Sequence, residues 1–252
     1  MHALRSAPDH CLGYEHIQGN QLLRKQIARL SFNWGGALSD DDIVVTAGCM
    51  EALSFCLKAV TNPGDAVATE SPTFYGIFRV MQSLGLKVVE VPTDPATGID
   101  ITYLEQAIPR FNIKACLFVC NFNNPLGNII PDDKKKQLVE MLAKKDIPLI
   151  EDDIYGEMYF GKTRPKTCKT FDKKGLVLHC GSFSKSLAPG YRIGLAVTGK
   201  FKDSVIQLKR MHNVATNTLA QSAIAHFLQN GRYELHLRHL RKALHTQCLR
   251  YL

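Results

Sequence analysis

The sequence has few of the features that mark secreted, disulfide-linked or membrane-spanning proteins. It contains no run of about 18 apolar residues, the length that a membrane-spanning helix needs. Its first residues, MHALRSAPDH, have no apolar core of the kind that a secretion signal carries. No internal repeat and no low-complexity linker interrupts the chain. We therefore expect a globular protein of the cytoplasm.

The cysteines do not form a disulfide pattern. The eight cysteines lie at positions 11, 49, 56, 116, 120, 168, 180 and 248, and none is part of a CxxC motif. Cys116 and Cys120 fall within an apolar run, ACLFVC, and are expected to be buried thiols. In a chain of this length the pattern is typical of a reducing cytosol rather than of a disulfide framework.

Size and charge set wide limits on structure and partners. The chain has 252 residues, enough for one large domain or two modest ones, and 45% of them are hydrophobic, so a sizeable core can form. Its formal net charge is +8. This charge would suit an anionic ligand or weak, non-specific binding of nucleic acid, and a basic protein with neither partner fits it equally well.

Strand patterns alternate with helical patterns along most of the chain. Short apolar or β-branched runs, expected to be strands, lie at 42–46, 66–70, 86–92, 114–120, 147–152 and 176–182. Helices are expected at 20–30, 50–60, 75–84, 101–108 and 131–145, and almost throughout from 201 onward, with Gly231 as a break. This alternation predicts βαβ units and a mainly parallel sheet covered on both faces. Ligands bind such sheets beyond the carboxyl ends of the strands.

The segment GSFSKSLAPGYRIG, residues 181–194, sets one lysine among small residues. Lys185 could act as a nucleophile toward a carbonyl, as lysines do in pyridoxal phosphate (PLP) enzymes, although a surface lysine in a serine-rich turn is the ordinary alternative. Ser182, Ser184 and Arg192 add hydroxyl and guanidinium groups that suit a phosphate. In TAGCMEAL, an expected strand passes through Gly48 into an expected helix, whose N-terminus could also bind phosphate.

Two other segments follow expected strands. LIEDDIYGEMYF, residues 149–160, carries Glu151, Asp152 and Asp153 in a row. A carboxylate there could hold a pyridine nitrogen protonated, bind a metal or cap a helix. NFNNPLG, residues 121–127, is typical of a turn, and an asparagine in it could donate to a ring oxygen.

The joint order of these segments resembles the fold-type I PLP enzymes, the class I and II aminotransferases. In chain order they run as a glycine turn, an aromatic residue after a proline, Asn-Pro-x-Gly, Asp-x-x-Tyr, Ser-x-Ser-Lys and an arginine. The resemblance runs from about Tyr14 to the C-terminus, and SFSKSLAPGYRIG is a highly specific motif. ATESPTFYGIF, NFNNPLG, EDDIYGEMYF and CGSFSKSLAPGYRIG are most similar to the aminotransferase-like domain of MocR-type (GntR-family) bacterial regulators.

The resemblance implies an α/β fold, the three-layer αβα large domain of these enzymes with a mainly parallel, mixed sheet, and PLP as cofactor. Lys185 would hold PLP as a Schiff base, and Asp152 would pair with its pyridine nitrogen. Tyr155 and Asn124 would bond the 3-oxygen of the ring. The Phe74 ring would stack on the cofactor ring. The phosphate would be bound by Ser182 and Arg192 and by the backbone N–H groups of Gly48, Cys49 and Met50. Phe74 could instead be a core residue.

The implied activity is amino-group transfer between amino acids and 2-keto acids, in a homodimer in which Tyr14 reaches the phosphate of the partner subunit. One alternative is a ligand-sensing domain of a regulator, in which PLP and an amino acid act as a signal with little turnover. Another is a remnant that no longer binds PLP. No metal site and no membrane contact are expected. Direct contact with nucleic acid is not expected either, since the leucines of 234–250 suit a packed amphipathic helix.

The sequence departs from the family pattern at one turn and at both ends. Leu126 stands where the family usually has threonine in Asn-Pro-Thr-Gly. The resemblance divides the chain into a large domain, 1–232, and the start of a long helix, 233–252, that leads to a small domain. It implies that most of that small domain is missing, with the arginine that grips the substrate carboxylate, and that an N-terminal winged helix is absent. We therefore expect PLP binding with slow turnover, because substrate positioning supplies much of the acceleration.

Overall fold

The computed structural model describes residues 13–251, which are built around one eight-stranded sheet. Parallel pairing joins β7 to β6, β6 to β5, β5 to β2 and β2 to β3, whereas β8 is antiparallel to both β1 and β7, and β4 is antiparallel to β3. The sheet is therefore mixed and mainly parallel, as expected. In sheet order the strands are β1 (Ile43–Thr46), β8 (Gly194–Val197), β7 (Val177–Ser182), β6 (Leu149–Asp152), β5 (Ile113–Phe118), β2 (Ala66–Ser71), β3 (Lys87–Asp94) and β4 (Gly98–Ile99).

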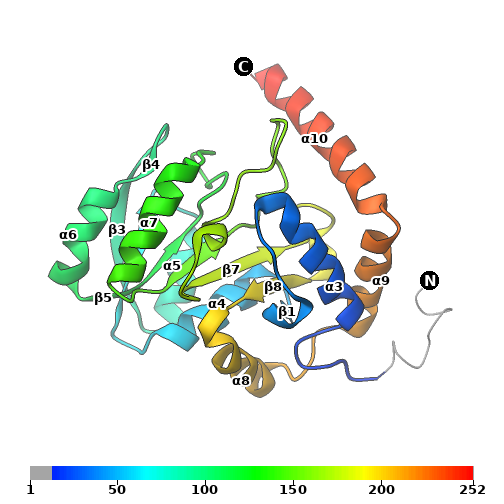
Figure 1. Ribbon diagram of the computed structural model, residues 1–252, viewed down its shortest axis with the longest axis horizontal. Helices are drawn as coiled ribbons and strands as arrows, with labels where there is room; N and C mark the ends of the chain where they lie inside the picture. The colour runs from blue at the N-terminus through cyan, green and yellow to red at the C-terminus, as the bar shows by residue number, and fades with distance from the viewer. Residues whose placement is uncertain (1–12, 252) are drawn as a thin grey trace.

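Helices cover both faces of the sheet and give the three-layer αβα architecture (Figure 1). One face packs against α6 and α7 and, toward the β1–β8 end, against α3, α9 and α10, whereas α4, α5 and α8 pack on the other face. The helices are α3 (Gln21–Leu30), α4 (Cys49–Val60), α5 (Tyr75–Ser83), α6 (Ile101–Phe111), α7 (Asp132–Lys144), α8 (Lys202–His212), α9 (Thr218–Gln229) and α10 (Arg232–Tyr251).

The central strands are apolar because both of their faces are covered. Successive residues point to opposite sides, so that Ala115 and Leu117 of β5 pack toward α4 while Cys116 and Phe118 pack toward α6 and α7. Cys116 and Cys120 are buried thiols, as expected, and Cys11 lies outside the described residues. The alternation of side-chain direction along the strands gives each helical layer its own core.

The expected helices and strands are all present, with ends displaced by a few residues. Two strands were not expected: β8, and the two-residue β4. Pro131 was expected in the first turn of the helix at 131–145, but it is the N-cap of α7, which begins one residue later.

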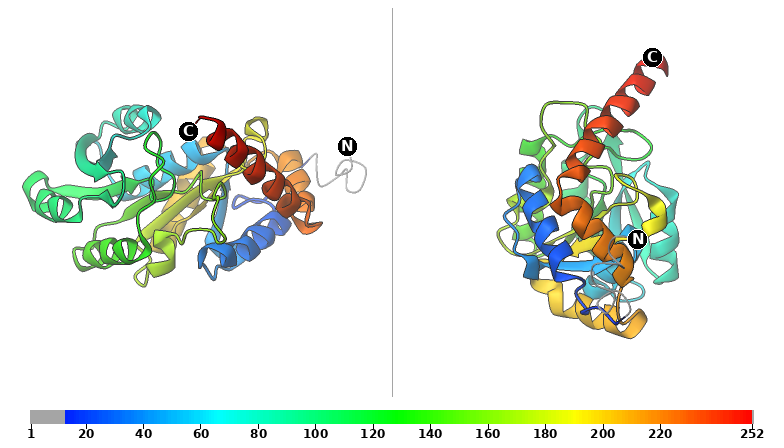
Figure 2. Two further views of the ribbon diagram at one scale, coloured as in Figure 1. Left: turned by 90° about the horizontal axis from the view of Figure 1, so that it is seen from above. Right: turned by 90° about the vertical axis from the view of Figure 1, so that its right-hand side faces the viewer.

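The last helix differs from the others in how it meets the rest of the molecule. Residues of its first turns, Tyr233 and Leu237, are buried against the β1–β8 end of the sheet. Its C-terminal half extends beyond the other elements (Figures 1 and 2). Among the helices of residues 13–251, none combines the length and the apolar character that crossing a membrane would require.

Candidate functional site

The segments singled out in the sequence gather at one edge of the sheet. β1 and β7 are both antiparallel to β8 and so run in the same direction, together with β2, β5 and β6. The carboxyl ends of these five strands therefore lie at the same edge. The residues at or just beyond the ends of β1, β2, β5, β6 and β7 are, respectively, Gly48, Phe74, Asn124, Asp152 and Lys185.

A glycine turn and an arginine form a cradle at the start of α4. Gly48 connects β1 to α4 with a φ of +94°, a left-handed conformation that favours glycine. The first N–H groups of α4 have no intrahelical partner, as in every helix, and no described side chain caps them. The Arg192 guanidinium lies against this turn and donates from Nη2 to the carbonyl of Ala47 at 3.2 Å. A Cβ on residue 48 would meet that Nη2 at 2.5 Å. Free helix N–H groups beside a guanidinium are suited to a phosphate.

The serine hydroxyls fix the backbone of the lysine loop. Ser182 Oγ accepts from the N–H of Ser184 at 3.1 Å and donates to the carbonyl of Ile193 at 3.0 Å, so the turn before Lys185 is joined to the neighbour of Arg192. The Lys185 side chain is exposed, with Nζ at 6.0 Å from the centre of the Tyr155 ring. The amine therefore sits on a fixed backbone and lies near the ring of Tyr155, which was expected to bond the 3-oxygen of the cofactor ring.

Two of the three consecutive carboxylates have structural roles. Glu151 accepts from the backbone N–H groups of Cys168 at 2.7 Å and Lys169 at 3.2 Å, and thereby caps a short 3₁₀ helix. Asp153 forms a buried ion pair with Arg164. Burial by itself would raise the pKa of Asp153, but the Arg164 guanidinium beside it holds that pKa below its usual value. Both carboxylates are satisfied within the protein, so capping explains the first and ion pairing the last.

Asp152 is the carboxylate that remains. It is 7% exposed, and no ion pair joins it to any described residue. Its Oδ1 accepts from the Cys49 thiol at 3.3 Å and from the backbone N–H of Ile154 at 3.1 Å. Burial raises the pKa of Asp152 to about 6, although these two donors act to lower it. A buried carboxylate without a cation is suited to a ligand that brings a positive charge.

Comparisons with known proteins show the family to which the chain belongs. Residues 2–248 match the model of the family "Aminotransferase class I and II". The chain belongs to that family. It is 42% identical over 231 residues to the uncharacterized HTH-type transcriptional regulator YjiR of Escherichia coli (strain K12), covering 92% of this chain and 49% of that protein. The chain thus spans about half the length of the curated relatives it matches. The resemblance to the aminotransferase-like domain of bacterial regulators is confirmed.

Solved aminotransferases have the same fold. Kynurenine aminotransferase of Pyrococcus horikoshii, solved with PMP, superposes with a TM-score of 0.89 at 29% identity, over 96% of this chain and 61% of that one. The α-aminoadipate aminotransferase LysN of Thermus thermophilus, solved with N-(5'-phosphopyridoxyl)-L-leucine, gives 0.87 at 26% identity, over 95% and 61%. The expected fold class, the large domain of fold-type I enzymes, is confirmed.

The chemistry of the site fits a phosphorylated pyridine aldehyde. The cradle at Gly48 and Arg192 offers donors to a phosphate, and Asp152 offers an unpaired carboxylate to a ring nitrogen. The Lys185 side chain is exposed, and a lysine amine can condense with an aldehyde. The α4 helix links the first two groups, because its first N–H groups face the cradle and its first side chain contacts Asp152.

The other expected site residues lie around this centre with fewer fixed contacts. Phe74 is half-buried and packs against the cluster that contains Cys49. Asn124 lies in a loop fastened by Asn123, which donates from Nδ2 to Glu70 at 3.0 Å. Met50 is the second residue of α4, and its side chain is 37% exposed. Tyr14 is 92% exposed, and no described residue of this site contacts it.

Sequence reasoning missed the side chains of two site residues. Cys49 was expected to contribute only its backbone N–H, yet its thiol contacts Asp152. Glu70 ends the buried part of β2 and holds the loop of Asn124, and burial raises its pKa to about 7. For Glu70, the sequence did carry a signal, namely a carboxylate placed directly after the run AVAT of an expected strand. For Cys49 no local signal existed, because its partner is more than 100 positions away.

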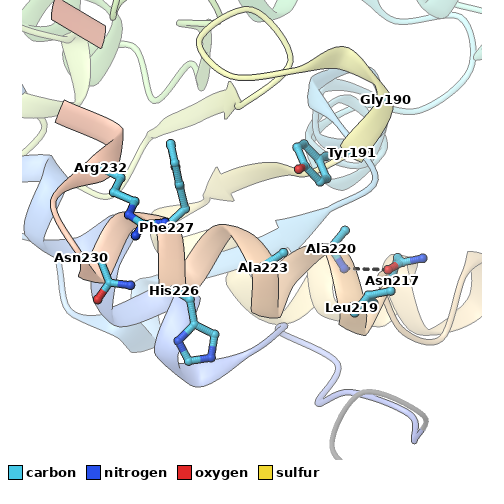
Figure 3. Close-up of a pocket in the computed structure, with 10 residues that line it drawn as sticks. All are labelled: Gly190, Tyr191, Asn217, Leu219, Ala220, Ala223, His226, Phe227, Asn230 and Arg232. Atoms are coloured by element: carbon cyan, nitrogen blue, oxygen red, sulfur yellow. Dashed lines mark hydrogen bonds between the residues drawn. The ribbon is translucent and has the colours of Figure 1, made fainter. Parts of the chain in front are cut away.

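A cavity lies away from these residues. It measures about 800 Å³ and opens between the loop at 189–191 and the helices α9 and α10 (Figure 3). Its lining includes Tyr191, Ala223 and Phe227 but neither Lys185 nor Asp152. Asn217 at its edge is occupied in capping α9, since its Oδ1 accepts from the N–H of Ala220 at 2.9 Å. The assignment of the site therefore rests on the strand ends and not on this cavity.

Proposed function

We propose that this domain binds PLP through the Lys185 amine and transfers amino groups between amino acids and 2-keto acids. The observation that carries the proposal is the meeting of three groups at one sheet edge. They are the Lys185 amine, the unpaired carboxylate of Asp152 and the Arg192 cradle at Gly48. The homodimer, the role of Tyr14, the cytoplasmic location and the domain boundary at 232 stay predictions.

Each group has a separate task in this proposal. PLP, when bound, supplies an electron sink for the carbanion left after proton removal from an amino acid. Asp152 keeps the ring nitrogen protonated, since a carboxylate that has lost its water gains most from a charged partner. The α4 N–H groups and Arg192 hold the phosphate. The Lys185 amine moves the proton at the substrate α-carbon.

Tyr155, Asn124 and Phe74 complete the proposed site around the ring. The Tyr155 hydroxyl and the Asn124 amide would donate to the ring 3-oxygen, and the Phe74 face would orient the ring. Turnover by this chain is expected to be slow, because no substrate clamp has been assigned among its residues and positioning contributes much of the rate.

A second candidate is a sensor domain that binds PLP and an amino acid with little turnover. The relatives named as HTH-type transcriptional regulators favour it. A contact within the chain favours it as well. Ser186, next to Lys185, forms hydrogen bonds with Tyr233 and His236 of α10. The loop that carries Lys185 and the last helix are therefore in direct contact.

The first experiment is the visible absorption spectrum of the purified chain with added PLP. We expect an absorption band that free PLP does not show. This band should be lost in Lys185→Ala and kept in Lys173→Ala, which serves as a control at an exposed lysine. A spectrum of free PLP from the unaltered chain would contradict the proposal.

Adding amino acids then separates the two functions. Loss of the band with formation of a keto acid, detected by mass spectrometry, supports transamination. A stable change of the band without keto acid supports the sensor. Both outcomes require the Lys185-dependent band, so a failure to bind PLP is distinguished from a failure to turn over.

A further inference from the structure

The Cys49 thiol lies between the two ends of the proposed site. Cys49 is the first residue of α4, so its backbone belongs to the phosphate cradle. Its side chain turns inward, 4% exposed, and places Sγ at 3.3 Å from Asp152 Oδ1. One residue thus joins the helix that would hold the phosphate to the carboxylate that would hold the ring nitrogen.

We propose that Cys49 is a positioning residue whose thiol donates a hydrogen bond to Asp152 and keeps that carboxylate ionised and oriented toward the cofactor ring. This inference rests on the proposed function and adds a residue to it. Cys49 acts only through Asp152 and is not proposed to react.

The hydrogen bonds that Asp152 accepts from described residues all go to one of its two carboxylate oxygens. The thiol and the backbone N–H of Ile154 both donate to Oδ1, while no described residue donates to Oδ2. Two donors on one oxygen fix the rotation of the carboxyl group. The other oxygen is left to accept from a protonated ring nitrogen.

The thiol is held in its donor form. Burial raises the pKa of Cys49 well above its usual value, and the nearby charge of Asp152 raises it further. The other titratable groups that act on the pair are Cys56, Asp153 and His179. Since a thiolate facing a carboxylate would be repelled, a protonated Cys49 is the form that can stabilise an ionised Asp152.

Cys49 could instead be a small core residue, and two substitutions separate the readings. Cys49→Ser keeps a donor of similar size, whereas Cys49→Ala removes the donor. The control is Cys56→Ala on the same helix, because the buried Cys56 thiol faces Cys180, at 3.6 Å between sulfurs, and does not bond Asp152.

The first measurement uses the apoprotein. In a carboxyl ¹³C NMR titration, we expect Cys49→Ala to raise the pKa of Asp152 above about 6, the value with the thiol donor in place, while Cys49→Ser and Cys56→Ala leave it near that value. Equal values in Cys49→Ala and the unaltered chain would overturn the inference. This readout does not depend on whether PLP binds.

The second measurement uses the PLP-bound protein. We expect Cys49→Ala to weaken PLP binding about three- to tenfold, the effect of losing one hydrogen bond of ordinary strength, because a thiol is a weak donor. It should also raise the pH midpoint of the visible band, because a less firmly protonated ring withdraws less charge from the Lys185 nitrogen. Recovery of the PLP affinity and of the pH midpoint in Cys49→Ser supports a positioning role for the thiol. A shift that Cys49→Ser fails to restore would show a packing role only, and loss of the band from every protein would overturn the proposed function itself.

Discussion

Glu70 shows at the scale of one residue how burial couples the site to pH. Its Oε1 accepts from Thr73 Oγ1 at 2.8 Å, from the N–H of Val119 at 3.2 Å and from Asn123 Nδ2 at 3.0 Å. Its Oε2 is buried and has no partner among the described residues. Burial raises the pKa of Glu70 from 4.5 to about 7, although these donors oppose the rise. The protonated form is therefore the one that the folded protein prefers.

The sign of the pH effect follows from the raised pKa. Because the folded pKa lies above the unfolded value, the contribution of Glu70 to stability is fully present below about pH 4.5 and is lost as the pH rises to about 7. The shift corresponds to about 3 kcal/mol. We expect Glu70→Gln, which cannot ionise, to gain stability relative to the unaltered chain between pH 5 and pH 8 by an amount of that order.

Urea unfolding at the two pH values measures this difference, with Glu140→Gln as a control at an exposed carboxylate. A gap between Glu70→Gln and the unaltered chain that is the same at both pH values would show that Glu70 does not titrate in this range. In that case Glu70 would stabilise the loop of Asn124 through its hydrogen bonds alone, without a contribution from its protonation state.

At the scale of elements, local pattern predicted those parts of the fold whose causes are local. α4 follows a glycine turn and carries a helical apolar pattern, so both its position and the cradle at its N-terminus were predicted. β8 was missed because GLAV is short and follows a motif read for its chemistry, and its strand form depends on pairing with β1 on one side and β7 on the other.

The three carboxylates after β6 show where prediction from sequence stops. Glu151, Asp152 and Asp153 are adjacent, and the sequence left capping, metal binding and cofactor contact open for them. Their roles depend on a loop that comes later in the chain, which brings the N–H groups of Cys168 and Lys169 to the first and Arg164 to the last. The resemblance selected Asp152, and the contacts of its neighbours explain why it alone of the three is committed neither to capping the 3₁₀ helix nor to an ion pair.

The contact between α10 and the lysine loop gives a prediction at this scale. Tyr233 Oη is bonded to Ser186 Oγ at 2.8 Å, and His236 Nε2 lies at 3.0 Å from the Ser186 carbonyl oxygen. We expect Tyr233→Phe to leave the Ser186 hydroxyl without its partner and to cost about 1 kcal/mol of stability. PLP affinity, measured by absorbance titration, should fall severalfold, since the backbone of Lys185 loses one of its restraints.

Tyr251→Phe is the matched control, because Tyr251 lies on the same helix and is 92% exposed. Equal PLP affinity in the two variants would mean that the loop is rigid without α10. That result would remove the structural support for the sensor reading, which needs the helix and the lysine to be coupled.

At the scale of the whole molecule, one network of buried and half-buried charges joins segments that are far apart in sequence. Arg164 pairs with Asp153 and, from Nε, with Glu157 Oε1 at 2.8 Å. Arg241 of α10 donates from Nη2 to Glu157 Oε2 at 3.2 Å and stacks over the Tyr159 ring, 3.8 Å from its centre. The network ties the end of β6 to the last helix, and no local sequence pattern could have shown it.

The charges in this network fix the expected cost of breaking it. Arg164→Met would leave Asp153 buried without its cation, and we expect a loss of about 3 to 5 kcal/mol at neutral pH in urea unfolding. The loss should shrink toward acidic pH, because Arg164 holds the pKa of Asp153 low in the folded protein and its removal lets the carboxyl take up a proton. Asp153→Asn combined with Arg164→Met should recover much of the stability, whereas Arg250→Met, at an exposed position of α10, should change it by less than about 0.5 kcal/mol. If the double variant were as unstable as Arg164→Met alone, the loss of stability would come from the missing packing of the arginine and not from an unpaired charge. The network would then hold α10 in place through side-chain packing.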